Sequence, residues 1–350
     1  MEKIRDNEVV TALSIYSCRV SACIATLDKE GFPNIVGLGK SEGKLLGGRG
    51  VLDVDILSMA IRDSLKIAQE EANLSSPKTF VSVTGGSITS EKSRGMVRLS
   101  QRGEEITERN IRDVLKVANT IPINISREII HSIPQDFIID GQGDIKNPVG
   151  LSAVKLEAET LLITAHTPFL HNIIKSLNLA GLELEDIVFS GIALSKCLLS
   201  ADTLEKGIVL LEIDNNFTAL SFFFDNVLRG VDIQQKSVIR DGVLESLKEN
   251  IDRMCGNKPI SKVILIGGGY IHEDFIEKVD SIFGIPSQVA YARNIRSSAK
   301  DINGPSYLTS IGLALYGLEQ RKKDFADKKG GLGILHKVTK RMGELLEEYF

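Results

Sequence analysis

The chain has 350 residues, a formal net charge of −4 at pH 7 and a pI of about 5.9. Hydrophobic residues make up 43% and charged residues 25%, a balance typical of a globular protein large enough for two or more domains. The weak negative charge lacks the basic footprint of a nucleic-acid-binding protein, and 5% aromatic residues without tryptophan argue against a base-stacking surface. The composition therefore predicts no nucleic-acid partner.

The cysteines and histidines indicate neither a disulfide framework nor a metal centre. None of the four cysteines (Cys18, Cys23, Cys197 and Cys255) forms a C-x-x-C pair, so we expect reduced, buried thiols in a cytoplasmic protein. The five histidines include no H-E-x-x-H motif, and we expect no metal site. No apolar run reaches the roughly 18 residues that a membrane-spanning helix needs, and the N-terminal sequence does not resemble a signal peptide.

The first 86 residues predict a small subdomain of mixed strands and helix. Its expected elements are a hairpin over 8–27, a strand over 35–40, a loop over 41–53, a helix over 55–72 and a strand over 78–84. Asp53 or Asp55 is the expected cap of the helix, because a short acidic side chain accepts hydrogen bonds from the first free backbone N–H groups.

Residues 87–165 predict a separate small domain, a mostly antiparallel sheet with one helix. The helix is expected over 107–120, where Thr107 and Asn110 lie close to a capping arrangement. The expected strands cover 95–99, 128–134, 137–140, 154–156 and 160–164.

Residues 166–320 predict a second, larger half. Its expected helices cover 167–179, 190–199, 237–255, 271–283 and 307–320, and its expected strands cover 182–188, 207–213, 219–224 and 262–266. The polar break Asp214-Asn215-Asn216 joins two of these strands into a hairpin that resembles the one over 8–27. Two similar hairpins, each opening one half of the chain, indicate a duplicated fold with a cleft between the halves.

The turns of both hairpins lack the residues that hold a phosphate. A phosphate-cradling turn needs glycine for close backbone approach, and usually a carboxylate that positions Mg²⁺ or water. The first turn, over 14–19, has neither, and the second keeps only Glu212, with Phe217 where a phosphate would need space. Gly267-Gly268-Gly269 is the one glycine loop after a buried strand, and a plain strand-to-helix turn explains it equally well. The chemistry does not predict an efficient ATPase.

The C-terminal residues predict a charged linker over 321–331 and an amphipathic helix over 332–350. The apolar positions of this helix are Leu332, Ile334, Leu335, Val338, Met342, Leu345, Leu346, Tyr349 and Phe350. The basic residues Lys337, Lys340 and Arg341 lie off that stripe, and Arg321, Lys322, Lys323, Lys328 and Lys329 precede it. One interpretation docks the helix on the core, and the other lays it on an anionic membrane surface.

Taken together, these elements resemble the bacterial cell-division protein family FtsA, of the actin-like ATPase superfamily. The resemblance is carried by Val83–Ile88, Glu105–Thr107, His131–Gln142, Asn147–Leu151, Phe189–Ala193 and Thr309–Gly317. His131–Gln142 is close to the family pattern h-x-I-P-Q-x-Y-x-V-D-G-Q. The resemblance implies an α/β fold: an actin-like, duplicated ribonuclease-H-type fold with a small α+β domain inserted in the first half. It also implies the boundaries 1–86, 87–165 and 166–320.

The resemblance implies an ATP and Mg²⁺ site. In this sequence, however, both phosphate loops of the family are degenerate. The family pattern L-D-I-G-T-S-K reads Leu13–Arg19 here, and I-D-I-G-G-G-T-T-D reads Leu211–Ala219. The positions that correspond to nucleotide contacts are Ser17, Arg19, Glu212, Thr218, Gly267, Gly268 and Gly269. We assign no catalytic residue and expect weak ATP hydrolysis or none.

The resemblance further implies a peripheral protein at the division site, on the cytoplasmic side of the cell membrane. The tail matches the family's membrane-targeting helix, and the implied partners are division proteins such as FtsZ and further copies of the chain. Only about fifty residues separate Thr218 from Gly267, too few for the subdomain that docks FtsZ in the family. Two alternatives stay open: a PilM-like scaffold of an envelope machine, and a slow ATP-dependent switch that forms filaments.

Overall fold

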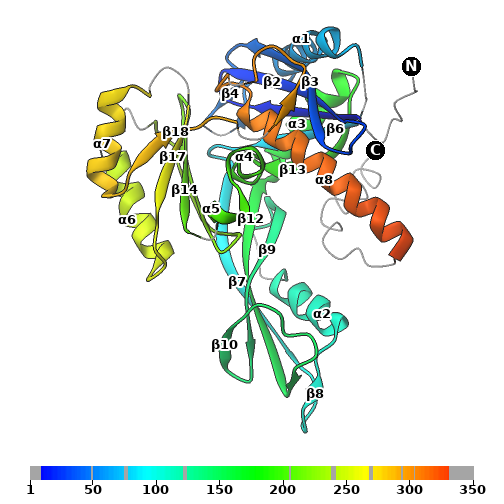
Figure 1. Cartoon of the computed structure of the whole chain (residues 1–350), viewed down its shortest axis with the longest axis vertical. Helices are drawn as coiled ribbons and strands as arrows, with labels where there is room; N and C mark the ends of the chain where they lie inside the picture. Colours follow the sequence, from blue (N-terminus) through cyan, green and yellow to red (C-terminus); the bar gives the residue numbers. More distant parts are fainter. Residues whose placement is uncertain are drawn as a thin grey trace. The chain divides into compact units, whose positions relative to one another are not determined.

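The computed structural model describes residues 9–330 except 49, 75–77, 121–123, 205, 238–241, 268–270, 293–294 and 303. The chain forms two compact units, and most of their helices and strands are labelled in Figure 1. The core unit comprises the described residues of Met1–Ile88 and Pro168–Gly333, and the inserted unit comprises those of Thr89–Thr167.

The first sheet of the core unit is built around the N-terminal hairpin. Its strand order is β13-β6-β1-β2-β3-β19. The strands are β1 (Val9–Ile15), β2 (Arg19–Leu27), β3 (Pro33–Glu42), β6 (Lys78–Val83), β13 (Glu183–Phe189) and β19 (Arg296–Ser297). β1, β2 and β3 form an antiparallel meander, whereas β6 runs parallel to β1 and β13 runs parallel to β6. Every residue of β1 is buried, which is why its sequence is apolar rather than alternating.

The second sheet of the core unit repeats this arrangement. Its order is β16-β15-β14-β17-β18, with strands β14 (Ile208–Ile213), β15 (Thr218–Phe224), β16 (Val227–Gln234), β17 (Lys262–Ile266) and β18 (Ser287–Val289). β14, β15 and β16 are antiparallel, and β17 and β18 continue in parallel from β14. The repeated pattern of a three-stranded meander followed by two parallel strands confirms the predicted duplication. The β14–β15 turn thereby corresponds to the β1–β2 turn.

The helices of the core unit cover the two sheets. They are α1 (Val54–Ala72), α3 (Thr167–Leu179), α4 (Ser190–Leu198), α5 (Ala201–Leu204), α6 (Val243–Cys255), α7 (Glu273–Phe283) and α8 (Leu308–Gly330). Asp53 caps α1 by accepting hydrogen bonds from the backbone N–H groups of Asp55 and Ile56. A Cβ atom on Gly312 would lie 2.0 Å from the Ala193 carbonyl oxygen, so the missing side chain allows α8 to pack closely against α4.

The inserted unit is an antiparallel sheet with one covering helix, as predicted. The order of its sheet is β10-β9-β12-β7, with β7 (Ile88–Arg98), β9 (Arg127–Ile139), β10 (Gln142–Ile145) and β12 (Lys155–His166). Two short strands, β8 (Glu104–Glu105) and β11 (Ser152–Ala153), pair with each other. α2 (Glu108–Ala118) begins with a complete capping box between Thr107 and Asn110.

Several predicted boundaries are wrong. The strands expected over 128–134 and 137–140 are one strand, β9, because Pro134 is accommodated by a register shift between Glu159 and Thr160 of the partner strand. The strands expected over 154–156 and 160–164 are likewise the single strand β12. α6 begins at Val243 rather than at Ser237, preceded by Gly242 in a left-handed conformation (φ 78°).

Two regions predicted to be irregular contain regular structure. The loop expected over 41–53 includes the short paired strands β4 (Leu46–Gly47) and β5 (Gly50–Val51). The linker expected over 321–331 is helical up to Gly330, since α8 continues through it. Within the described part of the chain, no helix is long and apolar enough to cross a membrane.

Candidate functional site at the hairpin turns

The turns of the two hairpins meet through an aromatic contact. Tyr16 of the β1–β2 turn stacks on Phe217 of the β14–β15 turn, with ring centroids 6.3 Å apart and planes at 16°. Both side chains are buried, with 5% and 3% of their surface exposed. Ala219 and the half-buried Ile233 complete this cluster, which we call the turn cluster. An apolar contact therefore occupies the junction at which the turns would face a shared ligand.

A buried glutamate adds polar bonds beside the turn cluster. Glu212, in β14, accepts hydrogen bonds at Oε1 from the hydroxyls of Thr84 (3.0 Å) and Ser190 (3.1 Å). The residue is 3% exposed, and burial raises its pKa to about 7, helped by the neighbouring charge of Asp214. The carboxyl group thus binds a proton near neutral pH. It also connects the second sheet to the first, because Thr84 follows β6 and Ser190 follows β13.

The hydroxyl of Tyr16 forms a third connection. It lies 2.7 Å from Oγ1 of Thr309, near the start of α8, in a fully buried hydrogen bond. Burial and the proximity of Glu212 hold the pKa of Tyr16 well above its usual value, so the phenol stays neutral. The guanidinium of Arg19 lies 5.2 Å from the centroid of the Tyr16 ring, a cation–π distance.

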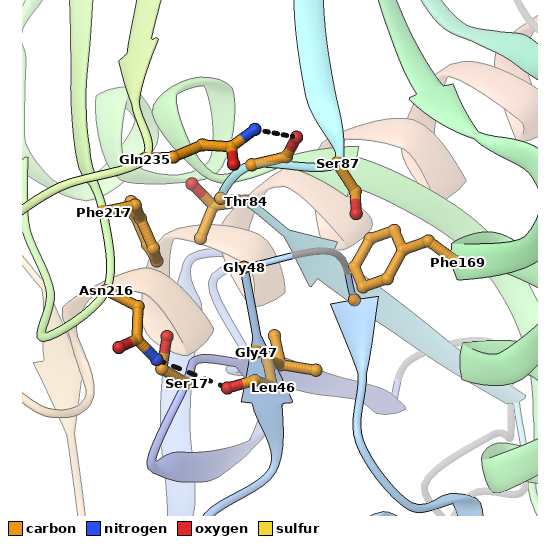
Figure 2. A pocket seen from close by; sticks show the side chains of 13 residues that line it. Ser17, Leu46, Gly47, Gly48, Thr84, Ser87, Phe169, Asn216, Phe217 and Gln235 are labelled. Carbon is orange, nitrogen blue, oxygen red and sulfur yellow. Dashed lines mark hydrogen bonds between the residues drawn. The ribbon is translucent and has the colours of Figure 1, made fainter.

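A small cavity remains between the turns and the loop after β6 (Figure 2). Its volume is about 20 Å³, room for about one water molecule. Ligand sites usually measure roughly 300–1,000 Å³. Two hydrogen bonds close it, from Nδ2 of Asn216 to the Leu46 carbonyl (3.4 Å) and from Nε2 of Gln235 to the Gly86 carbonyl (3.2 Å). In this conformation the space between the turns does not admit a triphosphate.

Comparisons with known proteins identify relatives of the chain. The family described as the SHS2 domain inserted in FTSA matches residues 85–164. Cell division protein FtsA of Borreliella burgdorferi is 22% identical, with 98% of this chain and 99% of that protein covered. The chain is thus similar to bacterial FtsA along nearly its whole length. FtsA of Escherichia coli K12 is 29% identical over 229 residues, which cover 65% of this chain and 54% of that protein, so the chain matches about half the length of this relative.

The solved structures agree on the fold. PilM in a PilM–PilN type IV pilus biogenesis complex superposes with a TM-score of 0.68 at 13% identity, covering 88% of this chain and 98% of that chain. The predicted fold class is therefore confirmed: an actin-like ATPase fold with an SHS2 domain inserted, as in FtsA.

The residues that correspond to FtsA nucleotide contacts make contacts within the protein. Ser17 lines the small cavity, and its carbonyl accepts hydrogen bonds from the N–H groups of Leu45 (2.9 Å) and Leu46 (3.1 Å). Thr218 is fully buried and donates its hydroxyl to the Lys236 carbonyl (3.0 Å), which commits this side chain to the second sheet. The Thr218 hydroxyl is therefore already occupied by a backbone carbonyl.

The glycine loop follows β17, at the same end of the sheet as Glu212. Ile266 pairs in parallel with Glu212, so Gly267 and the β14–β15 turn share one sheet edge. A Cβ atom on Gly267 would lie 3.1 Å from Cβ of Ile213, which makes this glycine a point of close packing. Gly268 and Gly269 lie outside the described residues.

The predicted membrane residues, from Leu332 to Phe350, also lie outside the described residues. Arg321, expected among the basic residues that favour a membrane, has a structural role instead. Its guanidinium forms an ion pair with Glu185 that is bidentate, through Nε at 3.0 Å and through the second nitrogen, and it lies 5.8 Å from the ring of Phe80. A side chain held inside the core unit does not contribute to a basic surface.

Thr84, Ser190, Thr309, Asn216 and Gln235 are site residues that the sequence did not reveal. Short polar residues near strand and helix ends are common, and each of these bonds joins residues far apart in the chain. Thr84 and Glu212, for example, are 128 positions apart. Only the mutual placement of the two sheets brings them together.

Proposed function

We propose that this chain is an FtsA-like scaffold of the cell-division machinery, which works at the cytoplasmic face of the bacterial membrane without a nucleotide cycle. The SHS2 insertion and the similarity to FtsA along 98% of the chain support the division assignment. The amphipathic tail predicted over 332–350 supports peripheral attachment to anionic lipids. Self-association is expected by analogy with FtsA.

One observation supports the nucleotide-independent part of this proposal: the turn cluster lies between the two hairpin turns, where the FtsA resemblance implies a phosphate. Tyr16 and Phe217 are buried against each other, and aromatic pairs of this kind contribute about 0.5–1.5 kcal/mol beyond the burial of their surface. A nucleotide would have to separate this stack and break the hydrogen bonds of Asn216 and Gln235. The two halves are already joined by protein groups.

Calorimetric titration of the full chain with Mg-ATP tests this part. We expect no binding heat and no thermal shift, because the closed turns leave room for about one water molecule. Micromolar binding would contradict the proposal and would favour the slow ATP-dependent switch. The next test would then be hydrolysis by Glu212→Ala, since Glu212 is the one carboxylate kept from the second phosphate loop.

Co-sedimentation with anionic liposomes tests the membrane part. We expect the full chain to sediment with the lipid and a chain that ends at Lys329 to stay in the supernatant, because the shorter chain lacks the whole amphipathic segment. Removal of residues 330–350 leaves both sheets and all the contacts of the turn cluster in place. Equal sedimentation of the two chains would refute the tether.

A PilM-like scaffold is the second candidate, and one feature of the second sheet favours it. β16 ends at Gln234 and α6 begins at Val243, so there is no room between them for the FtsZ-docking subdomain that the FtsA resemblance implies. The solved PilM of the PilM–PilN complex matches over 98% of its length. Recovery of division proteins from a cross-linked pulldown, with midcell localisation, would support the first candidate; recovery of envelope-machine proteins without midcell localisation would support the second.

A further inference from the structure

A second cavity of the core unit lies away from the hairpin turns, between α4, α8 and the turn that leads into β3. Its volume is about 380 Å³, within the roughly 300–1,000 Å³ of small-molecule sites. We call it the α4–α8 cavity; these elements are neighbours in Figure 1. Its apolar lining is formed by Phe32, Pro33, Cys197, Leu199, Ile295, Leu315 and Leu318. The cavity is thus large enough for a ligand, and its lining combines this apolar surface with about as much polar surface, from Ser200 and the charged residues of the rim.

The three cations at the rim of the cavity differ in whether they have an acidic partner. Lys196 pairs with Glu319 (Nζ–Oε2 2.6 Å). Arg296 pairs with Asp28 (2.5 Å) and with Glu30 (2.8 Å). These contacts neutralise two of the three cations that line the cavity.

Lys322 is the third cation and is the exception. Its ammonium donates to the carbonyl of Gly31 (2.9 Å), and it forms no ion pair among the residues that the structure describes. A carbonyl oxygen does not neutralise the ammonium charge, so an anionic group placed at this rim would gain a charge-assisted hydrogen bond. The exposed position of Lys322 leaves it accessible to such a group.

We propose that the α4–α8 cavity binds an apolar ligand with a single anionic group, of the class of medium-chain fatty acids. The hydrocarbon chain would lie against the apolar lining, and the carboxylate would accept a hydrogen bond from Lys322. One available cation matches one anionic head group.

The position of the cavity would let such a ligand affect both halves of the core unit. α4 leads from β13 of the first sheet towards β14 of the second, and the segment with Ile295 and Arg296 returns from β18 to β19. Both connections line the cavity. A bound ligand would therefore contact the segments that link the two sheets, and would favour the arrangement in which the cavity is open.

Calorimetric titration of the full chain with sodium decanoate at pH 7.5, below its micelle-forming concentration, tests the proposal. We expect saturable binding to the wild type and at least about tenfold weaker binding to Lys322→Glu, which replaces an attractive charge by a repulsive one. Lys323→Glu is the matched control: it makes the same charge change at the next position of α8, on an exposed residue that does not line the cavity. We expect it to bind like the wild type.

Two further ligands separate the contributions of the chain and the head group. Octanoate lacks two methylene groups and should bind about fifteenfold more weakly, at about 0.8 kcal/mol for each buried CH₂. Decyltrimethylammonium carries the opposite charge and should not compete with decanoate. The variants share the same tail, so uptake by the C-terminal segment would not distinguish them.

The proposal is overturned if the wild type shows no saturable binding, if Lys322→Glu and Lys323→Glu bind alike, or if octanoate binds as tightly as decanoate. None of these measurements involves nucleotide, liposomes or a division protein. The fatty-acid site and the scaffold function therefore stand or fall separately.

Discussion

The protonation of Glu212 gives the most direct test of how the two sheets are joined. Burial raises the pKa of this carboxyl from 4.5 to about 7 in the folded chain. The folded protein therefore binds a proton between these pH values that the unfolded chain has already released. Stability from this group is fully present below pH 4.5 and is lost as the pH rises to about 7.

The magnitude follows from the shift. Each pKa unit corresponds to about 1.4 kcal/mol, so between pH 5 and pH 8 Glu212 should lower the free energy of unfolding by about 3 kcal/mol. Glu212→Gln removes this titration and keeps an oxygen that accepts from Thr84 and Ser190. Between pH 5 and pH 8, the free energy of unfolding of the variant should therefore fall by about 3 kcal/mol less than that of the wild type. This difference does not depend on the absolute stability of the variant.

Urea unfolding followed by circular dichroism at pH 5, 6, 7 and 8 measures the effect. Asp186, whose pKa burial also raises to about 7, contributes to the same fall in both proteins. His131, whose pKa burial lowers to about 4, contributes with the opposite sign, again in both. The comparison therefore isolates Glu212, and Glu183→Gln, an exposed glutamate of β13, is the control. An identical pH dependence in Glu212→Gln and the wild type would refute the reasoning.

Further predictions concern single contacts. Tyr16→Phe should lower the free energy of unfolding by about 1 kcal/mol, because it removes the hydrogen bond to Thr309; unchanged urea midpoints would contradict that bond. Gly312→Ala should lower the free energy of unfolding by about 1–3 kcal/mol, because the added methyl group overpacks the contact between α8 and α4. An unchanged free energy of unfolding would mean that the two helices separate easily. Arg321→Met should lower the free energy of unfolding by about 3 kcal/mol, because it leaves Glu185 without its partner. It should leave liposome co-sedimentation unchanged. A loss of lipid binding by the folded variant would show that Arg321 contributes to the membrane-binding surface.

Local patterns were sufficient for most of the fold. The hairpins are visible in the sequence because two apolar runs flank a short polar break, and both hairpins form as expected. Thr107 and Asp53 are found at the helix N-termini they were predicted to cap, since capping depends on residues only two or three positions away. The similarity of the hairpins indicates duplication, and the two sheets confirm it, because β13-β6-β1-β2-β3 of the first corresponds to β18-β17-β14-β15-β16 of the second.

The errors arose where tertiary pairing overrides a local signal. Pro134 is the last residue of the strand expected over 128–134, but a bulge lets β9 continue past it along β12. The charged residues after Gln320 indicated a linker, although Arg321 is drawn into the core unit by Glu185 and α8 continues to Gly330. A charge run does not reveal whether its members face solvent or a buried partner.

The sequence predicts which phosphate-binding residues the candidate site lacks, but not the contacts that its residues make. Missing glycines and Phe217 predict a poor phosphate site, and in the structure Phe217 is stacked on Tyr16 between the two turns. The bond between Tyr16 and Thr309 joins positions 293 residues apart, and no spacing rule connects them. Polar partners of this kind depend on how two sheets meet, which a single sequence does not encode locally.

The replacements in the two turns form a consistent set. A turn that releases its phosphate would leave backbone N–H groups and an acidic side chain without partners, at a cost of about 1–3 kcal/mol for each buried group. Here Asn216 and Gln235 bond to carbonyls across the junction, and Glu212 keeps bonds to two hydroxyls. Because Phe217 fills the remaining space, the halves are held together by bonds that need no ligand. Bonds that join the halves without a ligand are what the proposed scaffold, which works without a nucleotide cycle, requires.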